Sequence, residues 1–168
     1  MIFNAYSDGF VAIGEREVPC ALGPTGAIAA EDKREGDGAT PLGVWPIRRV
    51  LYRPDRVPAP ITELLVEPLR ETDGWCDDPA DPAYNRPVTL PYPASTERMW
   101  REDELYDIVV ILGHNDDPPV PGMGSAIFLH CAKRRYPPTQ GCVALAREDL
   151  EALLTMAGPG DALAILRR

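Results

Sequence analysis

The sequence predicts a mainly β protein: a single-domain sandwich of small mixed sheets, with one helix near the C-terminal end and long loops. The 168 residues include 19 prolines and 14 glycines, a composition that favours a turn-rich β protein over a helical bundle. Short alternating or apolar segments recur along the chain, and only one segment has helical periodicity. This length is typical of one domain with a sizeable core, so we expect residues 1–168 to form one domain.

The N-terminal part is expected to be strands joined by turns. Residues 2–6, 10–14 and 17–22 alternate as short strands do, and Ser7, Asp8 and Gly9 form a turn. Residues 44–52 are rich in apolar and β-branched side chains and predict a further strand. Pro46 places that strand either at a sheet edge or at a bulge.

The middle of the chain is irregular and dense in Pro and Asp. We expect residues 53–103 to be a loop-rich flank or lid on the same domain, because no repeated strand or helix pattern is present to build a separate core. Residues 106–113 form a near-continuous apolar run typical of a buried strand. Residues 125–130 predict another strand, which ends at His130.

The only predicted helix covers residues 147–157. Leu150, Leu153, Leu154 and Ala157 fall on one face of this helix, and Gly158 and Pro159 end it. Residues 161–166 predict a closing strand.

Composition excludes several classes of protein. The net charge of −9 argues against binding to nucleic acid. The basic tripeptide Lys133-Arg134-Arg135 is either a solvated loop tip or a clamp for substrate carboxylates. No apolar run reaches the ~18–20 residues that a membrane span needs, and residues 1–8 lack the basic and apolar regions of a signal peptide.

The four cysteines do not form a C-x-x-C pair, so a structural zinc site is not expected. We expect Cys20 and Cys131 to be buried thiols, whereas Cys76 could take part in a disulfide. Cys142 differs from these three because Gly141 precedes it and His130 stands at the other end of the same loop. A histidine beside a thiol can activate it as a nucleophile.

Several motifs in this order resemble the L,D-transpeptidase catalytic domain family, of the YkuD type. The first is His130, a loop of about a dozen residues, then Thr139-Gln140-Gly141-Cys142 and an apolar triplet. Residues 20–26, 33–43 and 106–130 also resemble segments of one branch of that family, so the likeness covers most of the chain. The resemblance implies a YkuD-like fold, with the Thr40-Pro41-Leu42-Gly43 turn beside the catalytic cleft.

The resemblance also implies a reaction and its residues. Cys142 would attack a carbonyl of a peptidoglycan stem peptide to form a thioester, and His130 would act as the base. The backbone carbonyl of Cys131 would hold the other ring nitrogen of His130, and the amides of Gly141 and Cys142 would bind the oxyanion. Neither a cofactor nor a metal is expected. The expected protein is a monomer in the periplasm or cell envelope that reacts with carbapenems and contributes to cell-wall biogenesis and cell shape.

Substrate binding is predicted for a wider group of polar residues. These are Tyr84, Arg86, His114, Asn115, Thr139, Gln140 and Arg147. Two positions depart from the usual family pattern: Gln140 replaces a His or Lys, and Ala144 replaces an Arg or Asn that holds the stem peptide. The donor could therefore be L-alanine, the first stem residue, which would give 1,3-type links in place of the 3,3-type links between two diamino acids.

Three alternatives stay open at this point. The same thiol could serve an L,D-carboxypeptidase or endopeptidase, in which water resolves the thioester. The chain could also be a catalytically inactive wall-binding module. A metal site formed by His114, His130, Cys131 and Cys142 is disfavoured, because adjacent residues of a strand point to opposite faces.

Overall fold

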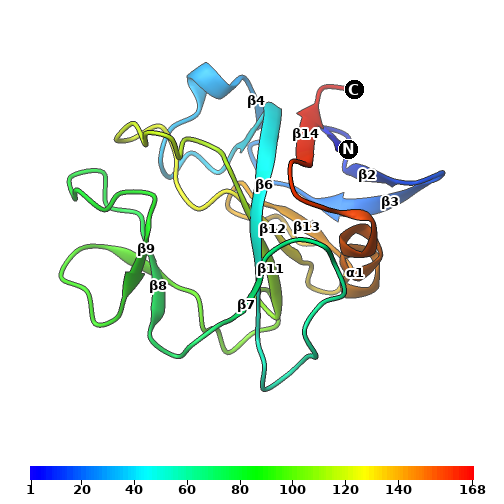
Figure 1. Ribbon diagram of the computed structural model, residues 1–168. Coiled ribbons are helices and arrows are strands. Elements are labelled where there is room, and N and C mark those ends of the chain that lie inside the picture. Colours follow the sequence, from blue (N-terminus) through cyan, green and yellow to red (C-terminus); the bar gives the residue numbers. More distant parts are fainter.

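The computed structural model describes residues 1–168 and is mainly β, as predicted (Figure 1). Most strands are short, and one α-helix and one short 3-10 helix accompany them. The strands are β1 (Ile2–Tyr6), β2 (Phe10–Ile13), β3 (Arg16–Ala21), β4 (Ala27–Ile28), β5 (Thr40–Pro41), β6 (Gly43–Tyr52), β7 (Val66–Pro68), β8 (Asp73–Cys76), β9 (Pro87–Thr89), β10 (Thr96–Arg98), β11 (Ile108–Leu112), β12 (Phe128–Cys131), β13 (Val143–Leu145) and β14 (Ala162–Leu166). The helices are α1 (Arg147–Met156) and η1 (Ala30–Asp32).

The central feature is a mixed nine-stranded sheet that closes into a barrel-like ring. Its order is β11-β12-β13-β3-β2-β1-β14-β6-β7, and β11 also pairs with β6. The pairs β1–β14, β12–β13 and β6–β7 are parallel, whereas the other neighbours are antiparallel. Closure leaves few free sheet edges, which are the sites where strands of other chains could pair.

The long strand β6 links the two sides of this ring. It pairs with β14 up to Pro46 and with β11 from Ile47 onward. The register with β11 shifts between Ile111 and Leu112, so the strand is irregular next to Pro46. Of the two expectations for Pro46, the bulge agrees with the structure and the sheet edge does not. β6 has partners on both sides, and the proline lies where it changes partner.

The main hydrophobic core fills the ring and extends under α1. It comprises 24 buried residues, among them Leu129, Cys131, Val143 and Leu145 of the two central strands. The predicted helical stripe points into this core, since Leu150, Leu153 and Leu154 are fully buried. A smaller cluster around Phe128 and Cys142 lies on the other face of β12 and β13.

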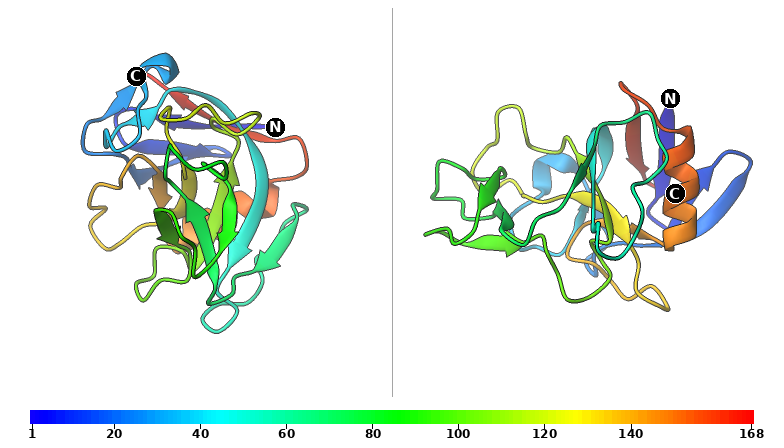
Figure 2. Two further views of the ribbon diagram at one scale, coloured as in Figure 1. Left: turned by 90° about the vertical axis from the view of Figure 1, so that its left-hand side faces the viewer. Right: turned by 60° about the horizontal axis from the view of Figure 1, so that its bottom comes forward.

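The flank is more ordered than the sequence indicates. Residues 53–103 contain β7 and the three-stranded sheet β10-β8-β9, which is separate from the barrel-like sheet. These strands were not predicted because each has only three or four residues and carries polar side chains, which is too short for periodicity to be visible. Figure 2 shows this small sheet and α1 on opposite sides of the molecule.

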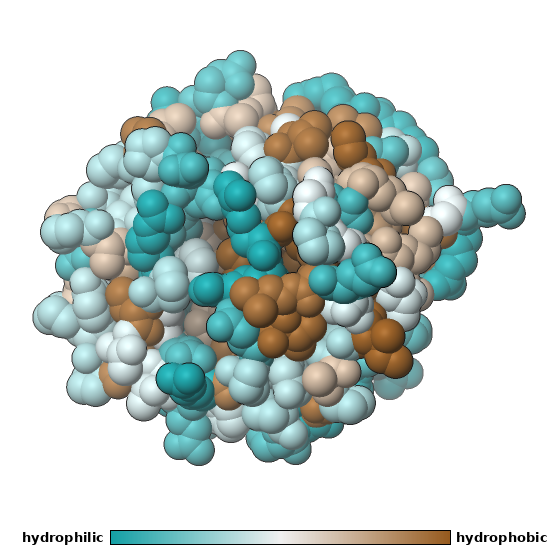
Figure 3. All heavy atoms as spheres, in the orientation of Figure 1, coloured by the Kyte–Doolittle hydropathy of each residue, from teal (hydrophilic) through white to brown (hydrophobic).

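The surface facing the viewer in Figure 3 is mostly hydrophilic, with hydrophobic atoms in separate small patches. No helix is long and apolar enough to cross a membrane.

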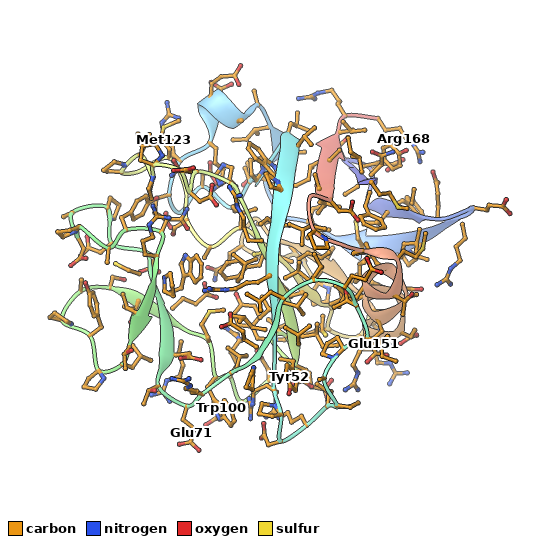
Figure 4. The ribbon with its side chains drawn as sticks, viewed as in Figure 1. Tyr52, Glu71, Trp100, Met123, Glu151 and Arg168 are labelled. Carbon is orange, nitrogen blue, oxygen red and sulfur yellow. The ribbon has the colours of Figure 1, made fainter.

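All four cysteines are buried free thiols, so Cys76 is not in a disulfide. Figure 4 labels Glu71 and Trp100 at the foot of the flank, where both residues line one pocket.

Candidate active site

One cleft brings together three segments that are distant in the chain. The first is β12 with the loop that leads to Cys142, the second is the loop after η1, and the third is the flank. Its lining includes Lys33, Glu35, Asp77, Glu97, Arg101, Tyr106, Ser125, His130, Lys133, Thr139, Gln140, Cys142 and Ala144. The flank, placed beside β11 and β12 in Figures 1 and 2, thus forms one wall of the cleft.

Strand register places Cys142 and His130 on the same face of the sheet. β12 and β13 run parallel, and His130 is opposite Ala144. Cys142 precedes Ala144 by two residues, so its side chain points to the same side as those of His130 and Phe128. Cys131 points the other way, into the main core. The loop between Cys142 and His130 folds back on itself, so both side chains line the cleft.

The Cys142 thiol is held by the backbone of Phe128, the first residue of β12, and of Ala126, which lies just before that strand. Its Sγ donates to the Ala126 carbonyl at 3.2 Å and accepts from the Phe128 amide at 3.4 Å. The side chain is only 6% exposed, and burial raises the pKa of the thiol to about 12. Glu97 also raises this pKa, whereas Lys33 and Arg101 lower it. Cys142 is therefore a neutral thiol in the free protein.

His130 is a neutral imidazole of defined tautomer. Its Nδ1 lies 2.8 Å from the carbonyl oxygen of Cys131, and because a carbonyl only accepts, Nδ1 carries the proton. Nε2 is then the basic nitrogen. Burial lowers the pKa of His130 to about 4, so the ring is uncharged near neutral pH. Its ring packs edge-on against Tyr106, with centroids 5.3 Å apart.

The segment before Cys142 is held by Thr139. Its Oγ1 donates to the carbonyl of Cys142 at 2.7 Å and accepts from the amide of Gly141 at 3.1 Å. The Gly141 amide is thus already engaged, whereas the Cys142 amide makes no hydrogen bond within the protein. The predicted pair of oxyanion donors therefore differs from the structure: only the Cys142 amide is free.

A charged network covers the side of the cleft next to His130. The hydroxyl of Tyr106 donates to Glu97, and Arg101 lies 3.9 Å from the same carboxylate. Arg101 and Lys133 both pair with Asp103, at 2.7 and 3.3 Å. Of the basic tripeptide only Lys133 lines the cleft; Arg134 and Arg135 are exposed. Sequence reasoning missed Glu97 and Arg101, because nothing in their local pattern marks them.

Another part of the cleft lining comes from the loop after η1. Lys33 is almost completely buried, and its Nζ contacts Asp37 at 2.5 Å and the carbonyl of Arg34 at 2.8 Å. Glu35 accepts from the hydroxyl of Tyr84 at 2.5 Å. Ser125 also lies here, buried, and its Oγ has no hydrogen-bond partner.

Five residues predicted to bind substrate do not line the cleft, and the structure gives them other contacts. Tyr84 is buried, and its hydroxyl donates to Glu35 and accepts from the Gly124 amide, whereas Arg86 is exposed. His114 packs under Trp45, and Asn115 bonds the carbonyls of Val120 and Gly124. Arg147 faces Asp107 at 3.8 Å. Thr139 and Gln140 are the predicted binding residues that do line the cleft.

No group of three or more His, Cys, Asp or Glu side chains is arranged to hold a metal ion. The chemistry on this face is that of a thiol, an imidazole and a free backbone amide.

Comparison with protein families identifies the fold. The L,D-transpeptidase catalytic domain matches residues 4–165, nearly the whole chain. The chain belongs to the L,D-transpeptidase catalytic domain family. No curated protein matches it significantly. The activity of L,D-transpeptidases is acyl transfer on peptidoglycan, and a mainly β structure with one helix is consistent with this family.

Proposed function

We propose that this L,D-transpeptidase cross-links peptidoglycan stem peptides through a thioester on Cys142, with His130 as the base. The observation that carries this proposal is the placement of both side chains in one cleft, with the His130 tautomer set by the Cys131 carbonyl. The protein acts without a cofactor, as a monomer, in the periplasm or cell envelope.

In the first half-reaction Cys142 and His130 start as a neutral thiol and a neutral imidazole, and the thiolate forms only as Sγ attacks the substrate. The Cys142 proton moves to Nε2 of His130 while Sγ attacks the donor carbonyl. The tetrahedral intermediate collapses, the C–N bond breaks, and His130 returns the proton to the leaving amine. The donor acyl group remains on sulfur as a thioester.

In the second half-reaction an amine of another stem peptide attacks the thioester carbonyl. A C–N bond forms, the C–S bond breaks, and a proton from the attacking nitrogen passes through His130 to the released thiolate. Water in place of the amine would give a carboxylic acid. The carboxypeptidase and endopeptidase alternatives differ from cross-linking only at this step.

The oxyanion of both steps is assigned first to the Cys142 amide, which has no partner in the free protein. The Gly141 amide becomes a second donor if the Thr139 hydroxyl releases it and keeps its bond to the Cys142 carbonyl. Loss of one oxyanion donor typically lowers the rate roughly 100- to 1000-fold.

The side chain at position 144 is the basis for proposing which stem-peptide residue is the acyl donor. Ala144 is buried and lines the cleft opposite His130, where it offers a methyl group and no hydrogen-bond donor. A stem peptide held at that point by an Arg or Asn in other members of the family has no such contact here. We therefore keep L-alanine as the proposed donor, with 1,3-type links as the product.

Tandem mass spectrometry of dimers formed by the purified protein on muropeptides tests the function and the donor. Links from L-alanine to a diamino acid support the full proposal, whereas links only between two diamino acids reject the donor assignment. Free peptide acids without dimers identify a hydrolase. No turnover, together with no carbapenem adduct on Cys142 by intact mass, would favour the inactive wall-binding module.

A further inference from the structure

The charges that line the cleft are balanced unequally. Three cations line it: Lys33, Arg101 and Lys133. Each already has a carboxylate partner that does not line the cleft, since Lys33 pairs with Asp37 and the other two pair with Asp103. The cations are thus neutralised by the protein itself.

The carboxylates that line the cleft are not neutralised in this way. Glu35 and Asp77 have no cation within 4 Å, and the only one near Glu97 is Arg101, at 3.9 Å. One oxygen of Asp77, Oδ1, is buried without any hydrogen-bond partner. A buried carboxylate oxygen without a donor is costly, so this wall of the cleft is complementary to a cation.

A second observation also indicates a missing ligand. Ser125 lines the same cleft and is only 9% exposed, and its Oγ has no partner. A hydroxyl can accept a hydrogen bond from an ammonium group. Since these carboxylates do not form a metal-binding group, the geometry favours an organic cation with several N–H donors.

Of the carboxylates in the cleft, Glu97 is the one linked to both His130 and Cys142. It accepts from the hydroxyl of Tyr106, whose ring packs against His130. Burial is the main cause that raises the pKa of Glu97, and Asp77 and Glu35 raise it further. The charges of Asp77 and Glu35 therefore repel that of Glu97, and the charge of Glu97 in turn raises the pKa of the Cys142 thiol.

We propose that Glu97 and Asp77, both supplied by the flank, form the site that binds the side-chain ammonium group of the acceptor stem peptide. This inference rests on the proposed function, which requires an amine close to the Cys142 thioester. Glu97 comes from β10 and Asp77 follows β8, so the small sheet of the flank holds both. The flank would then select an acceptor that carries a diamino acid.

The proton balance of the step follows from this placement. An ammonium group has no lone pair, so it gives one proton to Glu97 before the neutral nitrogen attacks. The second proton leaves through His130 to the thiolate as the C–N bond forms. Glu97 returns its proton to solvent when the product departs.

A binding experiment tests the site without catalysis. Cys142→Ala protein is titrated with a disaccharide tripeptide that has a free side-chain amine, and with the same compound acetylated at that amine. Since hydrogen bonds between charged groups are strong, we expect the free amine to bind at least about 10-fold more tightly. Adding Glu97→Gln should remove this difference, whereas Glu102→Gln, an exposed position of the flank, should retain it.

A kinetic experiment uses the intact thiol. Once the acyl-enzyme has formed, its division between cross-link and hydrolysed product is measured against acceptor concentration. Glu97→Gln should raise the acceptor concentration that gives equal amounts of the two products by about 10-fold. The side-chain oxygen of a glutamine at position 97 can still accept the hydrogen bond from the Tyr106 hydroxyl, so this contact is kept. Asp77→Asn provides a second variant if Glu97→Gln does not fold, because Asp77 Oδ1 has no partner to lose.

The outcomes separate this inference from the proposed function. If acetylation of the amine leaves affinity unchanged, or if both variants leave the product division unchanged, the ammonium site is wrong even though the enzyme cross-links. If wild-type protein forms no acyl-enzyme with stem peptides, the proposed function is wrong. The binding experiment then still decides the ammonium site by itself.

Discussion

His130 lies opposite Ala144 across the parallel β12–β13 pair, and this register turns its ring to the face of the sheet that carries Cys142. The same register turns Cys131 into the main core, where its side chain contributes packing and only its carbonyl reaches His130. The positions of the proposed nucleophile and base therefore depend on strand pairing and not on their loop alone.

Replacing Cys142 should stop the reaction and replacing His130 should slow it, in both cases without unfolding the protein. Cys142→Ala removes the proposed nucleophile, and we expect no acyl-enzyme by intact mass. His130→Ala should lower the acylation rate about 100- to 10,000-fold, the usual contribution of a positioned base. Turnover by Cys142→Ala at the wild-type rate would rule out the thioester. Circular dichroism of each variant checks that the fold is retained.

The reactivity of the free enzyme should increase steadily with pH. The pKa of Cys142 is raised to about 12 and that of His130 is lowered to about 4, so both groups are neutral between these values. We expect alkylation by iodoacetamide to accelerate about tenfold per pH unit from neutral pH to pH 10, as the thiolate fraction grows.

Peptide mapping identifies the thiol that reacts. Cys142 should be labelled first, because Cys20, Cys76 and Cys131 do not line the cleft. A plateau in rate below pH 8 would mean that a thiolate–imidazolium pair already exists, contrary to the burial of both groups. First labelling of another cysteine would contradict the site.

The Thr139 hydroxyl should matter for rate more than for folding. Thr139→Val keeps the shape and removes the bonds to the Gly141 amide and the Cys142 carbonyl. The Gly141 amide is then free, but the segment that carries the thiol loses its bond at the Cys142 carbonyl, so we expect acylation to slow by about tenfold. Thr139→Ser retains the hydroxyl and is the matched control. Equal rates for the two variants would show that the segment is held in other ways.

Gly141 should tolerate a side chain less well than another glycine of similar backbone. Gly141 and Gly26 both have positive φ, at 122° and 83°. A Cβ at position 141 would lie 2.7 Å from the carbonyl oxygen of Ala39, whereas nothing lies within 4 Å of one at position 26. We expect Gly26→Ala to cost about 1 kcal/mol from backbone strain alone.

Gly141→Ala should cost about 3 kcal/mol or more, because the clash is with backbone that cannot rotate away. Urea unfolding of both variants measures the difference. Similar free energies of unfolding would show that the segment before Cys142 can shift, and the acylation rate of Gly141→Ala would then show whether that shift reaches the thiol.

Much of the architecture was determined by local sequence. The buried run before Gly113, the helical stripe from Leu150 to Leu154 and the closing strand are all where their periodicity predicts, because burial imposes a repeat that the residues themselves display. The Cys142 and His130 pair was also visible, since one loop separates the two and the family motifs surround it.

Only the tertiary structure decided what surrounds that pair. Glu97 lies on the three-residue strand β10, and Asp77 directly follows the four-residue strand β8. Strands this short carry no periodic signal, and the fold brings both carboxylates into the cleft through the flank. His114 and Arg147 were predicted to bind substrate, yet packing directs them elsewhere. The physical reason is that strand pairing between distant segments decides which polar groups share a cleft, and local pattern does not encode that pairing.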